Sequence, residues 1–383
     1  MSFLGLTWDH PRGYDALAEA ARRVNAPRNK PLITWAKQPL EGFESAPIAD
    51  LAARHDLLVL DHPHIGEAVA EQCLIPLEDL YEARQITAWQ AECVGPSLAS
   101  YAWNGVHWAL PLDVATQVMA WRADRVAAPG NWADVLALAE KTPVAQSLGG
   151  PHAFLTLISI AAGQGHRVGG NDLLPGEMMG VALDIMHRLY AQRPKGSEHA
   201  NPIQLLETMA AGHDIALIPL IFGYVTYARP GPHGHAIRFG DSLAKPGGSG
   251  GVLGGTGIAF TKRAKPDRDL LDHVAWLMQT MTQTALIPAF GGQPSARTAW
   301  RDADVNADWG DFYAGTLQTA ETALLRPRFD GYIAFQNAAA AVIREALAAG
   351  TPIPNTIQTI KNQWHRARIA ARGELDDNRG PAT

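Results

Sequence analysis

Acidic and histidine side chains follow two of the apolar runs in the first third of the chain. Asp9 and His10 follow the run at residues 3–7, and Asp61 follows the run at residues 57–60. Carboxylates and imidazoles at such positions serve either as general acids and bases or as hydrogen-bonding groups for the hydroxyls of a bound ligand. No spacing pairs the carboxylates with one another, so the residues alone leave both chemistries open.

Two pairs of histidines have the spacing of half a metal site. They are His62 with His64, next to Asp61, and His233 with His235. The sequence has no His-Glu-x-x-His motif, and no spacing identifies a third ligand. Because the chain contains 14 histidines, accidental pairs are expected. We therefore predict neither a metal nor a cofactor.

A glycine-rich segment at residues 247–251 matches the G-x-S-x-G pattern of a nucleophile elbow around Ser249. The elbow needs a strand before it and a helix after it. Here Lys245 and Pro246 precede the segment, and a glycine-rich strand entry follows. The same glycines do not keep the spacing of a dinucleotide-binding motif. The segment is therefore predicted to be a flexible loop.

Length and composition limit the classes of function. The chain has 383 residues, of which 47% are hydrophobic and 18% charged, and its net charge is −6. The length favours two or three domains. A nucleic-acid binder would need a basic stripe, so we predict no nucleic-acid partner. The two cysteines, Cys73 and Cys93, exclude a disulfide scaffold and a zinc site made of four cysteines. The sequence leaves a single bridge between them open, and we expect two reduced or buried thiols.

Strand and helix patterns alternate around the candidate residues. Apolar runs predict strands at residues 3–7, 32–35 and 57–60, and helical periodicity predicts helices at 14–24 and 48–54. This βαβαβ order predicts a doubly wound open sheet. In such sheets the ligand lies outside the carboxyl ends of the strands. The polar loops that follow these three strands are therefore candidate ligand contacts.

The remaining two thirds of the chain contain more helices than strands. Asn104-Gly105 predicts the turn of a hairpin, and Asn131 is a candidate helix N-cap. Further helices are expected at residues 154–162, 177–191, 202–211, 269–281, 332–349 and 355–371, and strands at 214–220 and 257–261. Four residues form one apolar stripe of the helix at 269–281: Leu270, Val274, Leu277 and Met281.

The order of several segments resembles that of the family 1 extracellular solute-binding proteins of bacterial ABC importers, a group that includes maltose-type sugar-binding proteins. The similar segments are residues 104–113 with 116–124, 131–135, 212–217, 254–260, and 291–295 with Arg297. Residues 104–124 resemble the passage in which that family's chain crosses to its second lobe, and residues 254–260 resemble the return crossing. The resemblance covers nearly the whole chain.

The resemblance implies an α/β, two-lobed fold of the periplasmic-binding-protein type (type II), in which hinge strands join doubly wound sheets. The first lobe would comprise residues 1–112 and 257–299, and the second lobe residues 113–256 and 300–383. The implied function is that of the substrate-binding component of an ABC importer, which is not an enzyme. Such a protein is a periplasmic monomer that delivers its ligand to permease subunits. A hinge motion closes its lobes on a small polar solute, either a neutral or an acidic sugar-like molecule.

The residues expected to contact this ligand follow the strands or lie at the crossings. They combine carboxylates and amides, which bind hydroxyls, with aromatic faces, which stack on the apolar side of a sugar ring. They are Trp8, Asp9, His10, Arg12, Gln38, Glu41, Asp61, His62, His64, Asp113, Thr116, Gln117, Gly149, Gly150, His152, Tyr224, Gly255, Thr256, Gln293 and Arg297.

Two other classes of function are compatible with the same pattern. A hydrolase or lyase on this fold would use His10, Asp61 and His64, because a fold does not determine chemistry. A cytoplasmic ligand sensor is the second alternative, since the sequence as given opens without the basic start and apolar stretch of a signal peptide.

Overall fold

The structure, a computed structural model, describes residues 2–212, 214–232 and 234–377 and contains two compact units. The first unit comprises the described residues up to Ala115, together with Tyr224–Thr226 and Leu253–Glu321. The second unit comprises the rest of the described chain. His213, in one of the segments that carry the resemblance, and His233, from one of the histidine pairs, lie outside the described residues, as do the ends of the two predicted lobes, residues 1 and 378–383.

Besides a shift at two crossings, two segments lie in a different unit from the lobe in which the sequence places them. The chain passes from the first unit to the second after Ala115 and returns at Leu253, whereas the predicted boundaries follow residues 112 and 256. The two segments are Tyr224–Thr226 and residues 300–321, which the sequence places in the second lobe and which belong to the first unit.

Residues 300–321 pack within the first unit because large aromatic side chains anchor them there. The Trp300 indole donates to the carbonyl of Pro294 at 2.7 Å, and the Tyr313 hydroxyl donates to the carbonyl of Gly292 at 2.7 Å. The rings of Trp300 and Tyr313 also contact each other, with 5.5 Å between centroids. Both side chains are fully buried, so this segment forms part of the first unit's core.

The centre of the first unit is a sheet in the order β2-β1-β3-β9-β6, of which β6 (Leu110–Trp121) belongs to this unit only as far as Ala115. Its other strands are β1 (Phe3–Trp8), β2 (Ile33–Gln38), β3 (Leu57–Leu60) and β9 (Leu253–Phe260). β1 pairs in parallel with β2 and with β3, whereas β9 runs antiparallel to β3. The four residues of β3 are all buried, as expected for an interior strand with both faces covered.

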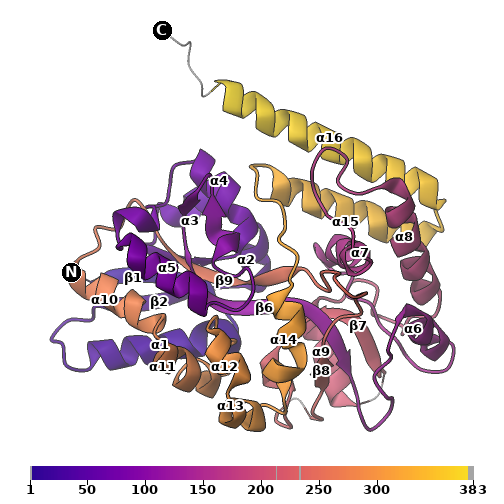
Figure 1. Cartoon of the computed structure of the whole chain (residues 1–383), viewed down its shortest axis with the longest axis horizontal. Helices are drawn as coiled ribbons and strands as arrows, with labels where there is room; N and C mark the ends of the chain where they lie inside the picture. The colour runs from indigo at the N-terminus through magenta and orange to yellow at the C-terminus, as the bar shows by residue number, and fades with distance from the viewer. Residues whose placement is uncertain (1, 213, 233, 378–383) are drawn as a thin grey trace. The chain divides into compact units, whose positions relative to one another are not determined.

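Short helices and turns make up the remainder of the first unit (Figure 1). They are α1 (Pro11–Asn25), α2 (Leu40–Ser45), α3 (Ile48–Ala52), η1 (His62–His64), α4 (Ile65–Ala70), η2 (Leu77–Asp79), α5 (Ala83–Glu92), η3 (Ala99–Tyr101), α10 (Arg268–Leu277), α11 (Thr280–Ala285), η5 (Pro288–Phe290), α12 (Arg297–Arg301), α13 (Ala303–Asp308) and α14 (Phe312–Glu321), with the hairpin strands β4 (Ala102–Trp103) and β5 (Val106–His107).

The predicted hairpin turn is present. Asn104 has φ of 53° and Gly105 has φ of 79°, so both central residues adopt the left-handed conformation that a type I′ turn requires. The predicted helix at residues 269–281 is shorter than expected, because Gln279 is extended and separates α10 from α11. Met281 therefore leaves the apolar stripe and is 77% exposed.

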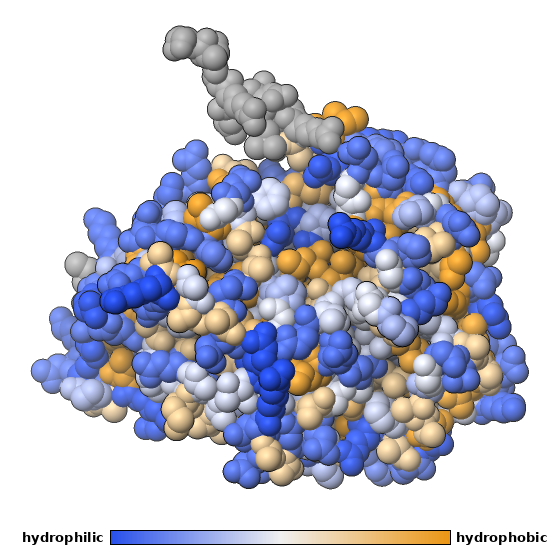
Figure 2. Space-filling view, in the orientation of Figure 1, coloured by the Kyte–Doolittle hydropathy of each residue, from blue (hydrophilic) through white to orange (hydrophobic). Residues whose placement is uncertain are grey.

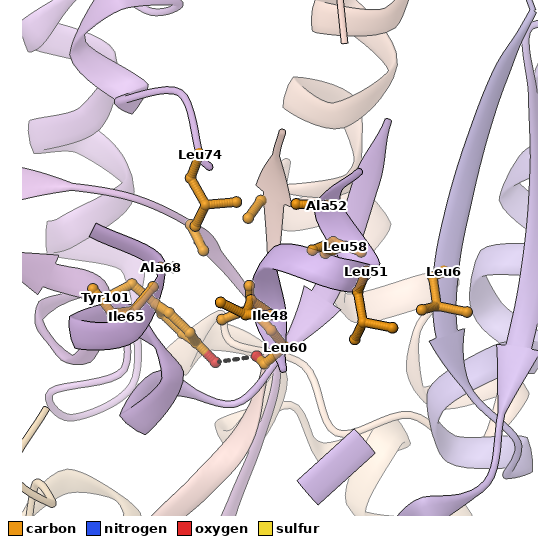
Figure 3. Close-up of a cluster of buried hydrophobic side chains, with 12 residues drawn as sticks. Leu6, Ile48, Leu51, Ala52, Leu58, Leu60, Ile65, Ala68, Leu74 and Tyr101 are labelled. Atoms are coloured by element: carbon orange, nitrogen blue, oxygen red, sulfur yellow. Dashed lines mark hydrogen bonds between the residues drawn. The ribbon is translucent and has the colours of Figure 1, made fainter. Parts of the chain in front are cut away.

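An apolar cluster supports the end of β3. Figure 3 shows side chains of α3, α4 and β3 packed around Leu60, with the Tyr101 hydroxyl directed at the Leu60 carbonyl, to which it donates at 3.3 Å. This cluster fixes the backbone where β3 ends and where Asp61 and η1 begin. It consists of Leu6, Ile48, Leu51, Ala52, Leu58, Leu60, Ile65, Ala68, Leu74, Tyr101, Ala109 and Ala259.

The second unit combines three strands with long helices. Its strands are the end of β6 (Leu110–Trp121), which begins in the first unit, with β7 (Leu217–Phe222) and β8 (Arg238–Gly240), both antiparallel to β6. Its helices are α6 (Trp132–Ala139), α7 (His152–Gly163), α8 (Gly176–Ala191), α9 (Pro202–Ala211), α15 (Tyr332–Ala349) and α16 (Ile353–Asp377), and the short turn η4 (Val225–Tyr227) lies at its border.

Helix α7 is the core of the second unit. All twelve of its residues are buried, and it packs against α8 and α15, while α16 lies along α15 (Figure 1). The predicted cap of α6 is confirmed, because the Asn131 side chain accepts from the Asp134 N–H at 3.0 Å.

Hydrophilic residues are interspersed with hydrophobic ones on the surface drawn in Figure 2. Val181, Met281 and Ile369 are large apolar side chains that the described part of the chain leaves exposed. Within the described residues, no helix is both long enough and apolar enough to span a membrane.

Candidate functional site

The carboxyl ends of β1, β2 and β3 lie along one edge of the first unit's sheet. Trp8 pairs with Gln38 across the parallel strands β1 and β2, and Asp61 directly follows β3. Because β9 is antiparallel, its pairing of Gly257 with Leu60 brings the start of β9 to this same edge. We call this edge, from Trp8 to Gly257, the carboxyl edge.

Four rings pack together at the carboxyl edge and form what we call the aromatic cluster: Trp8, His10, Phe43 and Tyr224. The His10 ring stacks on Trp8 at 4.9 Å with 8° between the planes, and the edge of Tyr224 meets His10 at 5.1 Å. Phe43 lies 5.9 Å from Trp8. The rings come from β1, from the N-cap of α1, from α2 and from the short segment Tyr224–Thr226, which belongs to the first unit although its neighbours in sequence do not. Phe43 is a residue that the sequence analysis missed.

His10 is fixed in position because it caps helix α1. Its Nδ1 accepts a hydrogen bond from the Arg12 N–H at 3.1 Å, and its backbone is extended, as is usual for an N-cap. In a neutral ring this contact places the proton on Nε2. The cap therefore sets both the orientation of the ring and its tautomer.

Arg12 lies between the aromatic cluster and a buried carboxylate. Its Nε lies 3.0 Å and its Nη2 2.8 Å from the oxygens of Asp113, and its guanidinium carbon is 4.5 Å from the centre of the Tyr224 ring and 5.4 Å from that of Trp8. A cation over aromatic faces is attracted by the ring quadrupole. The guanidinium therefore holds two rings of the cluster against the start of β6.

Burial and charge act in opposite directions on this pair. Burial, the largest single influence, lowers the pKa of Arg12, but the charge of Asp113 and its hydrogen bond, together with Tyr224 and Tyr313, leave the Arg12 pKa above its ordinary value. Burial also raises the pKa of Asp113, against the opposing influence of Arg12 and of the Gln293 N–H. Each of the two side chains thus serves as the counter-charge of the other inside the first unit.

A cavity of about 10 Å³ lies beside the pair and is lined by Arg12, Asp113 and Thr256, among others. The Thr256 hydroxyl is buried and has no hydrogen-bond partner. A space of this size accommodates about one water molecule and no larger solute. Of the predicted contacts, Arg12, Asp113 and Thr256 therefore form the interior behind the aromatic cluster.

The predicted residues after β3 also contact one another. Asp61 caps η1 by accepting from the His62 N–H at 2.8 Å, and it lies 3.2 Å from the His62 ring. His64 lies 3.7 Å from the carboxylate of Glu67. Both histidines are at most 2% exposed, whereas the Asp61 side chain keeps 18% of its surface. In the parts of the chain that the structure describes, no three His, Cys, Asp or Glu residues gather as metal ligands do.

Two further residues of the carboxyl edge are at its exposed rim. Asp9 is 57% exposed and pairs with Lys37 at 2.6 Å, and the Gln38 carbonyl accepts from the Asp9 N–H at 2.7 Å. Gly255, with φ of 101°, approaches the backbone of Asp113 too closely for a side chain. Glu41 belongs to α2, and its side chain is not described.

Two predicted contacts are used elsewhere within the first unit. Gln293 is fully buried, and both ends of its amide are hydrogen-bonded to backbone. Arg297 donates to Glu321 and to the carbonyl of Ala91 at 2.9 Å. It lines an open groove of about 550 Å³ between α5, α12 and α13. The structure therefore places Arg297 with these helices rather than with the aromatic cluster.

The predicted residues of the second unit lie around one end of α7. Gly150 has φ of 52°, and Arg344 donates to its carbonyl and to that of Leu148. His152 is buried, and its ring meets Phe222 edge-on at 5.7 Å. The structure thus brings Gly149, Gly150 and His152 together at the start of α7.

A polar stripe runs along α7 and reaches β6. His152, Thr156 and Ser159 are spaced i, i+4 and i+7, so they share one face of the helix. The Ser159 hydroxyl donates to Oε1 of Gln117 at 2.6 Å, and Nε2 of Gln117 is buried without a hydrogen-bond partner. Thr116, the neighbour of Gln117 on β6, is also buried. Thr156 and Ser159 are not among the residues predicted from the sequence, although two polar residues at this spacing in an otherwise apolar helix indicate a polar face.

The family model of bacterial extracellular solute-binding proteins matches residues 43–313, more than half of the chain. No curated protein matches the chain by sequence.

Solved structures match nearly the whole fold. One is an ABC transporter solute-binding protein from Agrobacterium radiobacter in complex with ribitol, with a TM-score of 0.80, 16% identity, and 96% of this chain and 98% of that chain covered. The sugar-binding protein MalE of Xanthomonas citri has a TM-score of 0.78 at 17% identity, with 99% and 100% covered. A solute-binding protein from Agrobacterium vitis with bound D-mannitol has a TM-score of 0.74 at 14% identity and covers both chains completely. At these identities the likeness establishes the periplasmic-binding-protein fold that the sequence predicts.

Proposed function

Because the chain belongs to the family of bacterial extracellular solute-binding proteins, we propose that it binds a neutral sugar or polyol and delivers it to an ABC permease. The family is one of binding proteins, in agreement with the predicted non-enzymatic function. Two solved proteins of the same fold carry such ligands, one ribitol and the other D-mannitol. The periplasmic location and the monomeric state follow from the same proposal.

The aromatic cluster at the carboxyl edge is the observation that carries this proposal. A sugar or polyol has an apolar face of C–H groups and a rim of hydroxyls. His10 and Phe43 are half-buried rings at this edge, held by Trp8 and Tyr224, which are at most 5% exposed. Asp61 follows the neighbouring strand with a partly exposed carboxylate. Stacking on the rings and hydrogen bonds to the carboxylate together suit a polyhydroxylated ligand.

The internal pairing of charges supports a neutral rather than an acidic ligand. The Arg12 guanidinium is paired with Asp113, and Lys37 with Asp9. Arg297 is paired with Glu321. A carboxylate ligand would have to compete with these intramolecular partners for each cation, whereas hydroxyl groups need no counter-charge.

We further propose that the two units act as the lobes of a cleft-type binder. The second unit would contribute Thr116, Gln117, Gly149, Gly150 and His152 as further contacts with the ligand. Closure would then follow from contacts that the ligand makes only when both lobes are engaged.

The geometry of the histidines gives no support to a hydrolase or lyase. Nδ1 of His10 is occupied by the cap of α1, and His64 is buried beside Glu67. Two titrating groups directed at one reacting bond would be needed for such an enzyme.

Titration calorimetry with ribitol, D-mannitol and maltose tests the proposal. We expect at least one of these to bind, and we expect Trp8→Ala and Asp61→Ala to weaken its binding about tenfold or more, because about 1.4 kcal/mol corresponds to one decade. Asp50→Ala, on the exposed side of α3 in the same unit, is the control and should bind like the parent. Parent-like affinity in both folded test variants would place the site elsewhere, and binding of organic acids alone would contradict a neutral ligand.

A further inference from the structure

Gln293 holds together two segments at which the chain leaves the first unit. Its backbone and side chain form a pair of hydrogen bonds with Val114, each 2.8 Å long, from the Val114 N–H to the Gln293 carbonyl and from Nε2 to the Val114 carbonyl. Its Oε1 accepts from the Val225 N–H at 3.0 Å. Val114 is next to the crossing after Ala115, and Val225 lies in the short segment Tyr224–Thr226. One fully buried amide therefore joins both segments.

The second unit holds the continuing ends of the same segments. The Thr116 carbonyl accepts from the Gly223 N–H at 3.1 Å. The Gln117 N–H donates to the Val252 carbonyl at 3.1 Å, and the Ser159 hydroxyl binds both the Gln117 side chain and the Val252 N–H, the latter at 3.1 Å. Ser159 is 1% exposed, so these contacts are also buried.

Very few backbone bonds remain outside these two sets of contacts. Only Ala115 separates Val114 from Thr116, and only Tyr224 separates Gly223 from Val225. Rotation about the φ and ψ angles of one residue is soft, whereas rupture of a buried hydrogen bond leaves an unsatisfied polar group. At these two of the five crossings between the units, any change in backbone direction is therefore concentrated at Ala115 and Tyr224.

We infer that Gln293 is a positioning residue that confines the bending at these two crossings to Ala115 and Tyr224. This inference rests on the proposed function, which requires the units to move. It also gives Tyr224 a double position: its backbone lies at a bending point, and its ring belongs to the aromatic cluster. A ligand that binds to the aromatic cluster would thereby restrain the residue whose backbone must turn, because the buried Tyr224 ring packs on His10.

The test compares Gln293→Met with Gln283→Met. Gln283 is a matched control, because it is also fully buried in the first unit and also uses both ends of its amide, in contacts with Leu277 and Ser295 that involve no crossing segment. Nitroxide labels at exposed positions of α5 and α6, introduced as Ala88→Cys and Ala137→Cys with the two native cysteines replaced by alanine, report the distance between the units by pulsed electron resonance.

In the ligand-free protein we expect Gln293→Met to broaden the distance distribution at least twofold relative to the parent. Gln283→Met should lower the melting temperature by a similar amount and leave the width unchanged. If Gln293→Met does not fold, Ser159→Ala, which removes the corresponding contacts in the second unit, should broaden the distribution in its place. Equal widths in the parent and in the folded crossing variant would overturn the inference.

The measurement separates this inference from the proposed function. Ribitol, D-mannitol or maltose should shift the parent's distribution to a narrower one. If none of them does, the proposed ligand class fails, whereas the ligand-free comparison of the two glutamine variants still decides the role of Gln293.

Discussion

The guanidinium of Arg12 and the carboxylate of Asp113, 101 residues apart in sequence, form a buried bidentate pair. The two side chains are 5% and 4% exposed. The pair joins the first turn of α1 to β6 just before the chain leaves the first unit. The aromatic cluster and the crossing therefore share one support.

Arg12→Ala should destabilise the protein strongly, because it leaves the Asp113 carboxylate buried without its partner. The expected loss in the free energy of unfolding is about 3–5 kcal/mol, measured by urea denaturation. Arg12→Met combined with Asp113→Leu should recover much of it, since an apolar pair carries no desolvation cost. Arg22→Ala, which removes an exposed ion pair of the same helix, should leave the urea midpoint nearly unchanged. A mild effect of Arg12→Ala would show that water reaches the pair.

Gly13→Ala should disturb the aromatic cluster directly. A Cβ at Gly13 would overlap the indole nitrogen of Trp8, which packs on this turn of α1. We expect a destabilisation of about 1–3 kcal/mol and a shift in tryptophan fluorescence as the ring moves. Gly180→Ala in α8 is the control, since a Cβ there makes only ordinary contact. Equal destabilisation and equal tryptophan fluorescence in the two variants would contradict the predicted overlap with Trp8.

The free energy of unfolding should decrease as the pH falls below the pKa of an ordinary histidine, because of His273. Burial, with a smaller effect from the charge of Arg28, lowers the pKa of His273 from 6.5 to about 4. A depressed histidine pKa gives stability that is complete above pH 6.5 and is lost progressively towards pH 4, by about 3 kcal/mol. Urea denaturation from pH 7 to 4 should show this slope, and His273→Gln should flatten it. His365→Gln, at an exposed position of α16, should not.

The two cysteines should be unreactive in the folded protein. Burial raises the pKa of Cys73 and of Cys93 to about 11, so little thiolate is present at pH 8. Ellman's reagent should label Cys93, which is 2% exposed, only after denaturant is added. Rapid labelling of Cys93 in the native state would mean that α5 opens locally.

Local signals in the sequence predicted the elements better than the site. The Asn104-Gly105 turn and the Asn131 cap depend on neighbouring residues, and both are present. The partners of Gln293, by contrast, lie about 70 and 180 residues away, and no local pattern distinguishes an amide that binds backbone from one that binds ligand. The periodicity of residues 269–281 wrongly predicted one continuous helix, because it does not reveal that Gln279 is extended and interrupts the helix.

Tertiary packing also determines which polar side chains remain available to a ligand. The sequence places Asp9, His10 and Asp61 at strand ends, and pairing of the strands brings those ends to one edge. It does not reveal that Arg12 is neutralised by Asp113, or that Arg297 is held by Glu321. Such pairs form only when distant segments meet, so composition near a strand end overestimates the number of side chains that a ligand can use.

The antiparallel pairing of β3 with β9 has a consequence for the synthesis of the protein. Leu60 and its partner Gly257 are separated by nearly two hundred residues, so β3 emerges from the ribosome long before β9 exists. During that interval β3, four apolar residues long, has an unpaired edge that attracts other strands. The first unit also needs residues as far as Glu321. Its folding is therefore dominated by non-local contacts and cannot be completed until most of the chain is available, and a chaperone that covers β3 in that interval would raise the yield.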